Sequence, residues 1–201
     1  MASVNDPSEQ LEQSLAESAR VIAGLWAQRA AIALIGDELV RALQQGGKVL
    51  TAGNGGSAAE ALHMAEELVG RFKANRPPLA AVALVADPTA LTCIGNDFGF
   101  DAIFSRQVEA LGRPGDVLVL FSTSGRAANL RPALAAARDQ GLKTVCLLGR
   151  DGGELAGQAT HEIIVRHQDT ARIQEAHQVL LHVLLEIVDS VFTPVPHGKS
   201  A

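Results

Sequence analysis

Apolar residues form two alternating patterns along most of the chain. From about residue 8 to residue 45 they recur every three or four positions, which predicts two leading helices that end at Gly46 and Gly47. Continuous apolar runs predict five buried strands, at 48–53, 79–85, 116–122, 143–149 and 161–166. Helical spacing returns in the segments 57–72, 126–141 and 170–192.

Buried strands that alternate with helices are typical of a parallel sheet covered on both faces, so we predict an α/β fold, a three-layer sandwich. The length of 201 residues suits one domain. We expect residues 1–45 to be leading helices for oligomer packing, 46–193 the α/β core, and 194–201 a frayed tail. The last helix is apolar nearly all round, which predicts burial in a subunit interface or bundle and therefore an oligomer.

Charge and cysteine usage narrow the function classes. A net charge of −5 argues against a protein that grips nucleic acid, which needs a basic face, and favours small-molecule chemistry. Cys93 and Cys146 lie in apolar runs, which predicts buried, reduced thiols in a cytoplasmic protein. The acidic start lacks the pattern of a signal peptide, and we expect no membrane-spanning run.

The stretch "GNGGS" joins the first predicted strand to a helix. Its glycines relax the backbone, and Ser57 and Glu60 have the spacing of a capping box. A tight turn before a well-capped helix explains these residues as well as a functional site does. On the functional interpretation, the amides at the helix start and the Ser57 hydroxyl form an anion site suited to phosphate.

A second strand end, "FSTSG", offers three hydroxyls before a glycine and a new helix, those of Ser122, Thr123 and Ser124. Most such residues are simple helix caps. Ligands of open α/β sheets collect at the carboxyl ends of the strands, so we expect both loops to face one crevice and bind one phosphorylated ligand.

Two helices carry the remaining candidates. His63 and Glu67 are four residues apart and share a helix face; the pair is either a solvated contact, a general base with its partner, or part of a zinc site. Gln174, His177 and His182 follow on the last helix, where a lone histidine is usually a core residue. Gln174 and His182 lie roughly 12 Å apart along a regular helix, which strains a single four-ligand site unless a pocket, an irregular helix or a neighbouring subunit intervenes.

The chain resembles the sugar isomerase (SIS) domain family and, within it, the phosphoheptose isomerases. The resemblance is carried by "GNGGSAAEALHMAEELVGRF", "NRPPLAAVAL", "IGNDFGFDAIFSRQVEALGRPGDVLVLFSTSG", "GRDGGELAG" and "RIQEAHQVLLH", and it spans nearly the whole chain. It implies a doubly wound five-stranded parallel sheet and a homotetramer with active sites at subunit interfaces. It also implies conversion of sedoheptulose 7-phosphate to D-glycero-D-manno-heptose 7-phosphate.

The resemblance also implies roles for single residues. The metal positions, for one zinc ion per subunit, are His63, Glu67, Gln174 and His182. Glu67 and His182 match the acid/base pair. The substrate positions are Asn54, Gly55, Gly56, Ser57, Glu67, Asn96, Asp97, Ser122, Thr123, Ser124 and Gln174, with Arg71 a weaker phosphate candidate.

One departure and three alternatives remain open. The family usually continues "STSG" with Asn-Ser, whereas this chain has Arg126 and Ala127, so one hydroxyl is lost. Related SIS tetramers bind the replication initiator without catalysis, but they typically lack the equivalents of Glu67 and His182. A sugar-phosphate sensor of a transcription regulator would need a DNA-binding segment, and none precedes the SIS-like region. An isomerase of another phosphosugar fits the same motifs.

Overall fold

The computed structural model describes residues 6–194, and its centre is one parallel sheet. The five strands follow the spatial order β2-β1-β3-β4-β5. Their bounds are β1 Val49–Gly53, β2 Ala81–Ala83, β3 Val117–Ser122, β4 Lys143–Gly149 and β5 His161–Val165. Because the order doubles back at β1, the carboxyl ends of β1 and β3 lie next to each other, where open sheets bind ligands.

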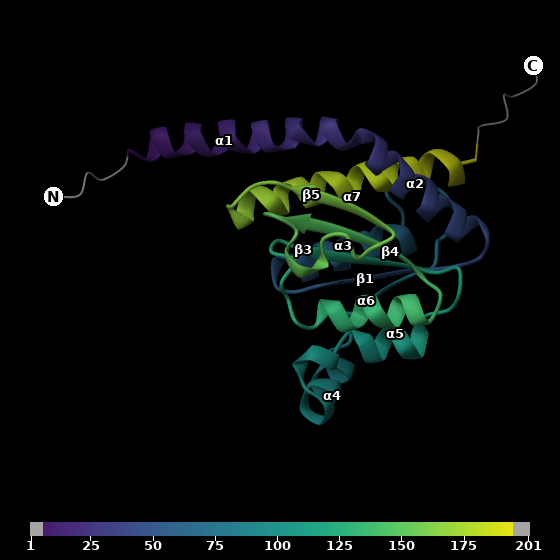
Figure 1. Cartoon of the computed structure of the whole chain (residues 1–201). Helices are drawn as coiled ribbons and strands as arrows, with labels where there is room; N and C mark the ends of the chain where they lie inside the picture. The colour runs from purple at the N-terminus through teal and green to yellow at the C-terminus, as the bar shows by residue number, and fades with distance from the viewer. Residues whose placement is uncertain (1–5, 195–201) are drawn as a thin grey trace, which may run out of the picture.

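Helices cover both faces of this sheet (Figure 1). Their bounds are α1 Pro7–Gly24, α2 Arg29–Gln44, α3 Gly56–Val69, α4 Pro88–Phe98, α5 Ser105–Leu111, α6 Leu130–Asp139 and α7 Thr170–Phe192, with short 3-10 turns at Leu25–Gln28, Phe100–Ala102 and Gly153–Leu155. Alternate strand residues point to opposite faces, so Val117 and Val119 pack with α2, α3 and α7, whereas Leu118 and Leu120 pack with α5 and α6. The predicted three-layer fold is confirmed.

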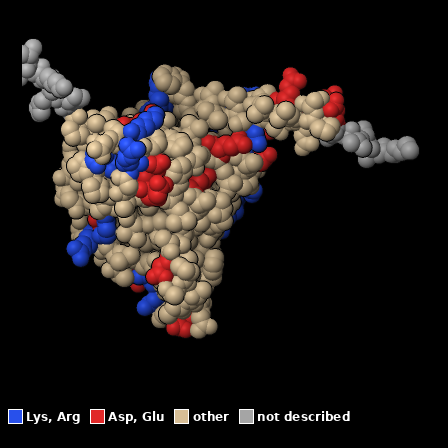
Figure 2. Space-filling model, turned by 180° about the vertical axis from the view of Figure 1, so that it is seen from behind, with Lys and Arg blue, Asp and Glu red and all other residues tan. Residues whose placement is uncertain are grey.

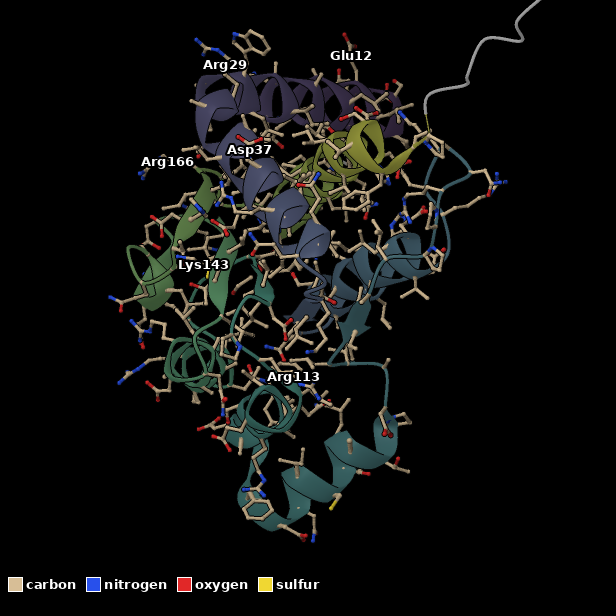
Figure 3. The ribbon with its side chains drawn as sticks, turned by 90° about the vertical axis from the view of Figure 1, so that its right-hand side faces the viewer. Glu12, Arg29, Asp37, Arg113, Lys143 and Arg166 are labelled. Carbon is tan, nitrogen blue, oxygen red and sulfur yellow. The ribbon has the colours of Figure 1, made fainter. Side chains whose placement is uncertain are left out.

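Two helices extend away from these layers. α1 reaches past the edge of the sheet, and α4 hangs below α5 and α6 (Figure 1). Neither helix has a fully buried residue. On α1 the side chains of Leu11 and Leu15 are 61% and 63% exposed. On the outer side of the leading helices, Glu12 and Arg29 point into solvent (Figure 3).

The leading helical segment Pro7–Gln44 is also long and apolar enough to cross a membrane. It is the only such helix among residues 6–194, and one helix of this kind is weak support for a membrane protein, because a core helix of a soluble protein or a signal sequence has the same length and composition. The 3-10 turn Leu25–Gln28 interrupts it and separates α1 from α2.

Several local predictions need correction. The strand predicted at 79–85 is only Ala81–Ala83, although the Leu84 amide still donates to the carbonyl of Thr51. The helix predicted from residue 126 begins at Leu130, because the preceding residues form a turn. Cys146 is buried, which raises its pKa to about 12, but Cys93 is exposed on α4. Of the predicted tail, all but residue 194 lies outside the described residues.

Candidate active site

The first site loop connects β1 to α3 and turns at Gly55, whose φ of 57° suits glycine. α3 begins at Gly56, so Ser57 lies inside the helix, is buried, and does not act as the N-cap. The predicted capping box is therefore wrong. Glu60 faces inward toward α7 instead of reaching back to the loop.

The second loop follows β3 and is held by its own hydroxyls. Ser122 accepts a hydrogen bond from the Gly125 amide at 3.0 Å, and Ser124 accepts one from the Arg126 amide at 3.2 Å. Thr123 lies half-buried between them. A side chain at Gly125 would collide with the carbonyl oxygen of Gly152, so this loop packs backbone to backbone against the loop after β4.

A pair of asparagines joins the two loops. The side-chain amides of Asn54 and Asn129 each donate to the other's oxygen, both at 2.9 Å. Asn129 is buried in the turn before α6, and sequence reasoning missed it. These two hydrogen bonds hold the loops side by side at the carboxyl edge of the sheet, and the prediction that both bind one ligand stays a prediction.

The first loop also meets α7. A Cβ built at Gly56 would lie 2.2 Å from Nε2 of Gln174, so only glycine leaves room for that side chain. Gln174 therefore lies beside the glycine loop. α3 and α7 pack against each other from this contact onward, and we call their shared polar contact line the α3–α7 seam: Gly56, Glu60, His63 and Glu67 on α3, and Gln174, His177, Gln178 and His182 on α7.

Further along the seam, three of the four predicted metal positions come together. Nε2 of His63 is 3.2 Å from Oε1 of Glu67. The ring centroids of His63 and His182 are 5.2 Å apart, in a T-shaped arrangement. Gln178 joins the two histidines: its Nε2 lies 2.7 Å from Nδ1 of His63 and 3.1 Å from Nε2 of His182.

These contacts fix the protonation of the rings. An amide N–H can only donate, so Nδ1 of His63 and Nε2 of His182 accept from Gln178, and Nε2–H of His63 points at Glu67. Burial and the neighbouring His63 lower the pKa of His182, whose ring also stacks on Phe72 at 5.5 Å. The imidazole of His182 is thus held neutral, with a lone pair facing the seam.

Gln178 is a second residue that sequence reasoning missed. Its position could have been found, because it lies four residues after Gln174 and four before His182 on one helix face. Gln174, which the resemblance places among the metal positions, lies one turn away from the histidine cluster in this chain.

The chemistry of this cluster suits a metal ion. Ligand atoms of His63, Glu66 and Glu67 lie within 4.8 Å of one another, and nitrogen and carboxylate oxygen are ligands that zinc accepts. His182 is not part of this group, although its ring centroid lies 5.2 Å from that of His63. The ligand types of His63, Glu66 and Glu67 therefore suit a zinc ion, whereas no hydrogen bond joins Gln174 to them within residues 6–194.

A buried ion pair anchors the far end of the seam. The guanidinium of Arg76 donates to Oδ1 of Asp189 on α7 at 2.6 Å and to the carbonyls of Glu67 and Leu68 at 2.8 and 3.0 Å. Burial alone would raise the pKa of Asp189, but the hydrogen bonds from Arg76 and the Lys73 and Ala74 amides outweigh it and lower that pKa. Arg76 thus caps the end of α3 that carries Glu67 and fastens it to α7.

Three other predicted substrate positions lie apart from this cluster. Asn96 and Asp97 are exposed at the end of α4 and hydrogen-bond to each other at 2.7 Å. Arg71 follows the last turn of α3 with its side chain exposed. One chain does not bring these three residues to the glycine loop.

The Arg126 side chain forms an ion pair with a residue outside the two strand-end loops. Its guanidinium donates to Asp151 of the following loop at 2.7 Å, and both side chains are at least half exposed. Asp151 raises the pKa of Arg126, so the guanidinium is charged at the rim of the crevice. On the face opposite to Figure 1, acidic and basic residues are interspersed among large uncharged areas (Figure 2).

Comparison with known proteins accounts for this arrangement. Residues 11–149 match the SIS domain family. Over 187 residues, covering 92% of this chain and 93% of the relative, the chain is 48% identical to the phosphoheptose isomerase of Escherichia fergusonii. The chain belongs to the phosphoheptose isomerase family of SIS-domain proteins.

Solved structures agree with this family membership. A phosphoheptose isomerase from Neisseria gonorrhoeae is 43% identical, with a TM-score of 0.85, over 92% of this chain and all of that one. One from Francisella tularensis is 36% identical, with the same TM-score, over 94% of this chain and all of that one. The fold of this chain is thus that of solved phosphoheptose isomerases.

Proposed function

We propose that the protein is an aldose–ketose isomerase that converts sedoheptulose 7-phosphate to D-glycero-D-manno-heptose 7-phosphate in the cytoplasm. This is the first step toward heptose for lipopolysaccharide core or related glycans. The observation that carries the proposal is that Glu67 and His182 both lie against His63 on the seam, beside two joined strand-end loops. The name shared by the relatives supports the same reaction.

The reaction moves a proton between neighbouring carbons through an enediol or enediolate. One base can take the proton from the first carbon and return it to the second, and we assign this role to the Glu67 carboxylate. The lowered pKa of His182 favours its neutral imidazole, and Nε2, which accepts from Gln178 in this structure, would accept and return hydroxyl protons or help to open the sugar ring once substrate replaces that hydrogen bond. Gln178 orients that ring.

The phosphate end is assigned to the two loops. Asn54, Gly55 and Gly56 supply amides at the start of α3, which favour an anion, and Ser57 supplies its hydroxyl, because its amide already donates to the carbonyl of Asn54. Hydroxyls come from the other loop, at Ser122, Thr123 and Ser124. Ser122 and Ser124 already accept from loop amides, so their own O–H groups are free to donate to phosphate oxygens.

A zinc ion would be held by His63, Glu67 and His182, with Gln174 as the fourth ligand that the resemblance implies. When bound, it would polarise the sugar oxygens on which negative charge develops. With zinc bound, Glu67 could still transfer a proton through its second carboxylate oxygen, and Arg76 holds the backbone of Glu67 in place by donating to its carbonyl.

The assembly we propose is a homotetramer. Its support is the exposed apolar surface: Leu11, Leu15, Trp26 and Leu34 of the leading helices are each more than half exposed. Neighbouring subunits would bury this surface and bring Asn96, Asp97 and Arg71 to a site that one chain leaves incomplete. In this arrangement residues 1–45 pack the oligomer around a single SIS domain.

The non-catalytic alternative, a replication-initiator-binding tetramer, is disfavoured because Glu67 and His182 are both present. On the seam, Glu67 contacts His63 and His182 contacts Gln178. Isomerisation of another phosphosugar uses the same residues. The assay below separates it from the proposed substrate.

The test is to incubate the purified protein with sedoheptulose 7-phosphate, with added zinc or a chelator, and to assay the aldoheptose phosphate. We expect product from the wild type, and a loss of about a hundredfold or more in Glu67→Gln and in His182→Gln, because each removes a proton-transfer group. Other ketose phosphates serve as competing substrates.

The matched control is Glu109→Gln, which removes an exposed carboxylate on α5, across the sheet. It should turn over like the wild type. No product from the wild type, or unchanged turnover in both site variants, would show that the assignment is wrong. Activity that a chelator leaves untouched would remove zinc from the proposal and leave the acid/base pair.

A further inference from the structure

A carboxyl group and an imidazole are buried together between the glycine loop and the histidine cluster. His177 is fully buried, and Glu60 is 5% exposed. Nε2 of His177 lies 3.2 Å from the carbonyl oxygen of Leu148 on β4. A carbonyl only accepts, so Nε2 carries a hydrogen, and Nδ1 is the atom that faces Glu60.

Nδ1 of His177 and Oε2 of Glu60 are 3.7 Å apart, somewhat beyond hydrogen-bond length. Within residues 6–194, neither atom has a hydrogen-bond partner. Two buried acceptors that face each other are unfavourable, because each has lost water and gained nothing. One proton between them satisfies both atoms, whichever carries it, and leaves the pair without net charge.

The location of the pair gives it a consequence for the site. α3 and α7 run in the same direction along the seam, so their residues pair in layers. One turn before the pair, Gly56 contacts Gln174. About one turn after it, His63 contacts Gln178. Glu60 and His177 therefore sit between the phosphate loop and the proton-transfer residues.

We propose that Glu60 and His177 are positioning residues joined by one shared proton, and that this bond sets the glycine loop against Gln174. The expected effect on turnover rests on the proposed isomerase function, whereas the hydrogen bond between Glu60 and His177 does not depend on that function. His177 also reaches β4 through Leu148, so the shared proton ties α3, α7 and the sheet together at a single point.

The experiment compares Glu60→Leu with Glu60→Gln. A glutamine amide can donate to Nδ1 of a neutral His177 and needs no shared proton, whereas leucine, of similar size, cannot donate. We expect Glu60→Leu to raise KM for sedoheptulose 7-phosphate about tenfold, or about 1.4 kcal/mol, with kcat within about threefold. Glu60→Gln should keep KM within about threefold of the wild type.

Rescue by glutamine and the split between KM and kcat separate positioning from general loss of structure. Equal KM values in Glu60→Leu and the wild type would overturn the proposal, and so would a Glu60→Gln variant as impaired as Glu60→Leu. Glu109→Leu on α5 is the control for loss of a carboxylate far from the seam, and it should match the wild type.

A measurement on the wild type needs no variant to fold. Nitrogen NMR of the His177 ring should show a proton on Nε2 and a hydrogen-bonded or protonated Nδ1. A free lone pair at Nδ1 would overturn the shared proton even if KM changes as expected. A wild type without turnover would end the isomerase proposal, and this signal would still test the pair.

Discussion

The α3–α7 seam and the outlying helices α1 and α4 are built in opposite ways. Along the seam, polar side chains are at least half-buried and lie against each other, from Gln174 at one end to His182 at the other, with the Arg76–Asp189 pair beyond. α1 and α4 bury no residue fully and expose large apolar side chains. The difference teaches that one chain orders the polar side chains of the seam by itself, whereas its outer helices leave apolar surface that the proposed tetramer would cover.

Breaking the Arg76–Asp189 pair should have the largest effect, because it frees the end of the seam. Arg76→Met leaves the Asp189 carboxylate buried without its cation, and we expect the free energy of unfolding to fall by about 3–5 kcal/mol in urea titrations. The double variant Arg76→Met/Asp189→Leu should be more stable than the single one, because no uncompensated charge remains. Equal stability of all three proteins would contradict the buried anchor.

The same pair predicts a pH dependence. The pKa of Asp189 is lower in the folded than in the unfolded protein. Its stabilising contribution is therefore complete above the unfolded pKa and is lost as pH falls through the folded pKa. We expect the unfolding curves of the wild type and Arg76→Met to converge in acid, measured by circular dichroism across that pH range.

The outlying region can be tested at α1. Leu11→Glu/Leu15→Glu places charges in the exposed apolar stripe and should shift the proposed tetramer to smaller species in sedimentation, while the fold of each subunit remains. Glu12→Gln changes an outward-pointing charge on the same helix and serves as the control (Figure 3). An unchanged sedimentation coefficient in the double variant would remove α1 from the interface.

A smaller effect is expected where the two strand-end loops meet. Asn129→Ala breaks both amide bonds to Asn54, and we expect KM for the phosphosugar to rise by roughly fivefold to tenfold, with stability lowered by about 1–3 kcal/mol. Asn129→Asp can still accept from Asn54 and should fall between the alanine variant and the wild type. KM is measured from initial rates.

The smallest effect belongs to the exposed Arg126–Asp151 pair. Solvent screens both side chains, so Arg126→Ala should leave the unfolding midpoint unchanged in a thermal melt. Its KM should change less than that of Asn129→Ala. A larger change in KM would show that Arg126 leaves Asp151 to bind the phosphate.

The fold was predictable because the strands are short apolar runs and most of them are followed by helical spacing, and neighbouring residues alone carry that pattern. The meeting of His63 with Glu67 was predictable for the same local reason. Links such as Asn54–Asn129 and Arg76–Asp189 were not, since their partners lie far apart along the chain. The capping box failed because two glycines allow α3 to start one residue earlier and turn Glu60 inward.

The contact between Gly56 and Gln174 constrains how this enzyme can change. Any side chain at position 56 would occupy the space that the Gln174 amide fills. The Gln174 amide is the end of a flexible side chain, so a residue larger than glycine at position 56 would displace that amide from the glycine loop. A substitution at position 56 therefore acts on the site by moving Gln174, and its effect on activity would report how much the position of that amide matters.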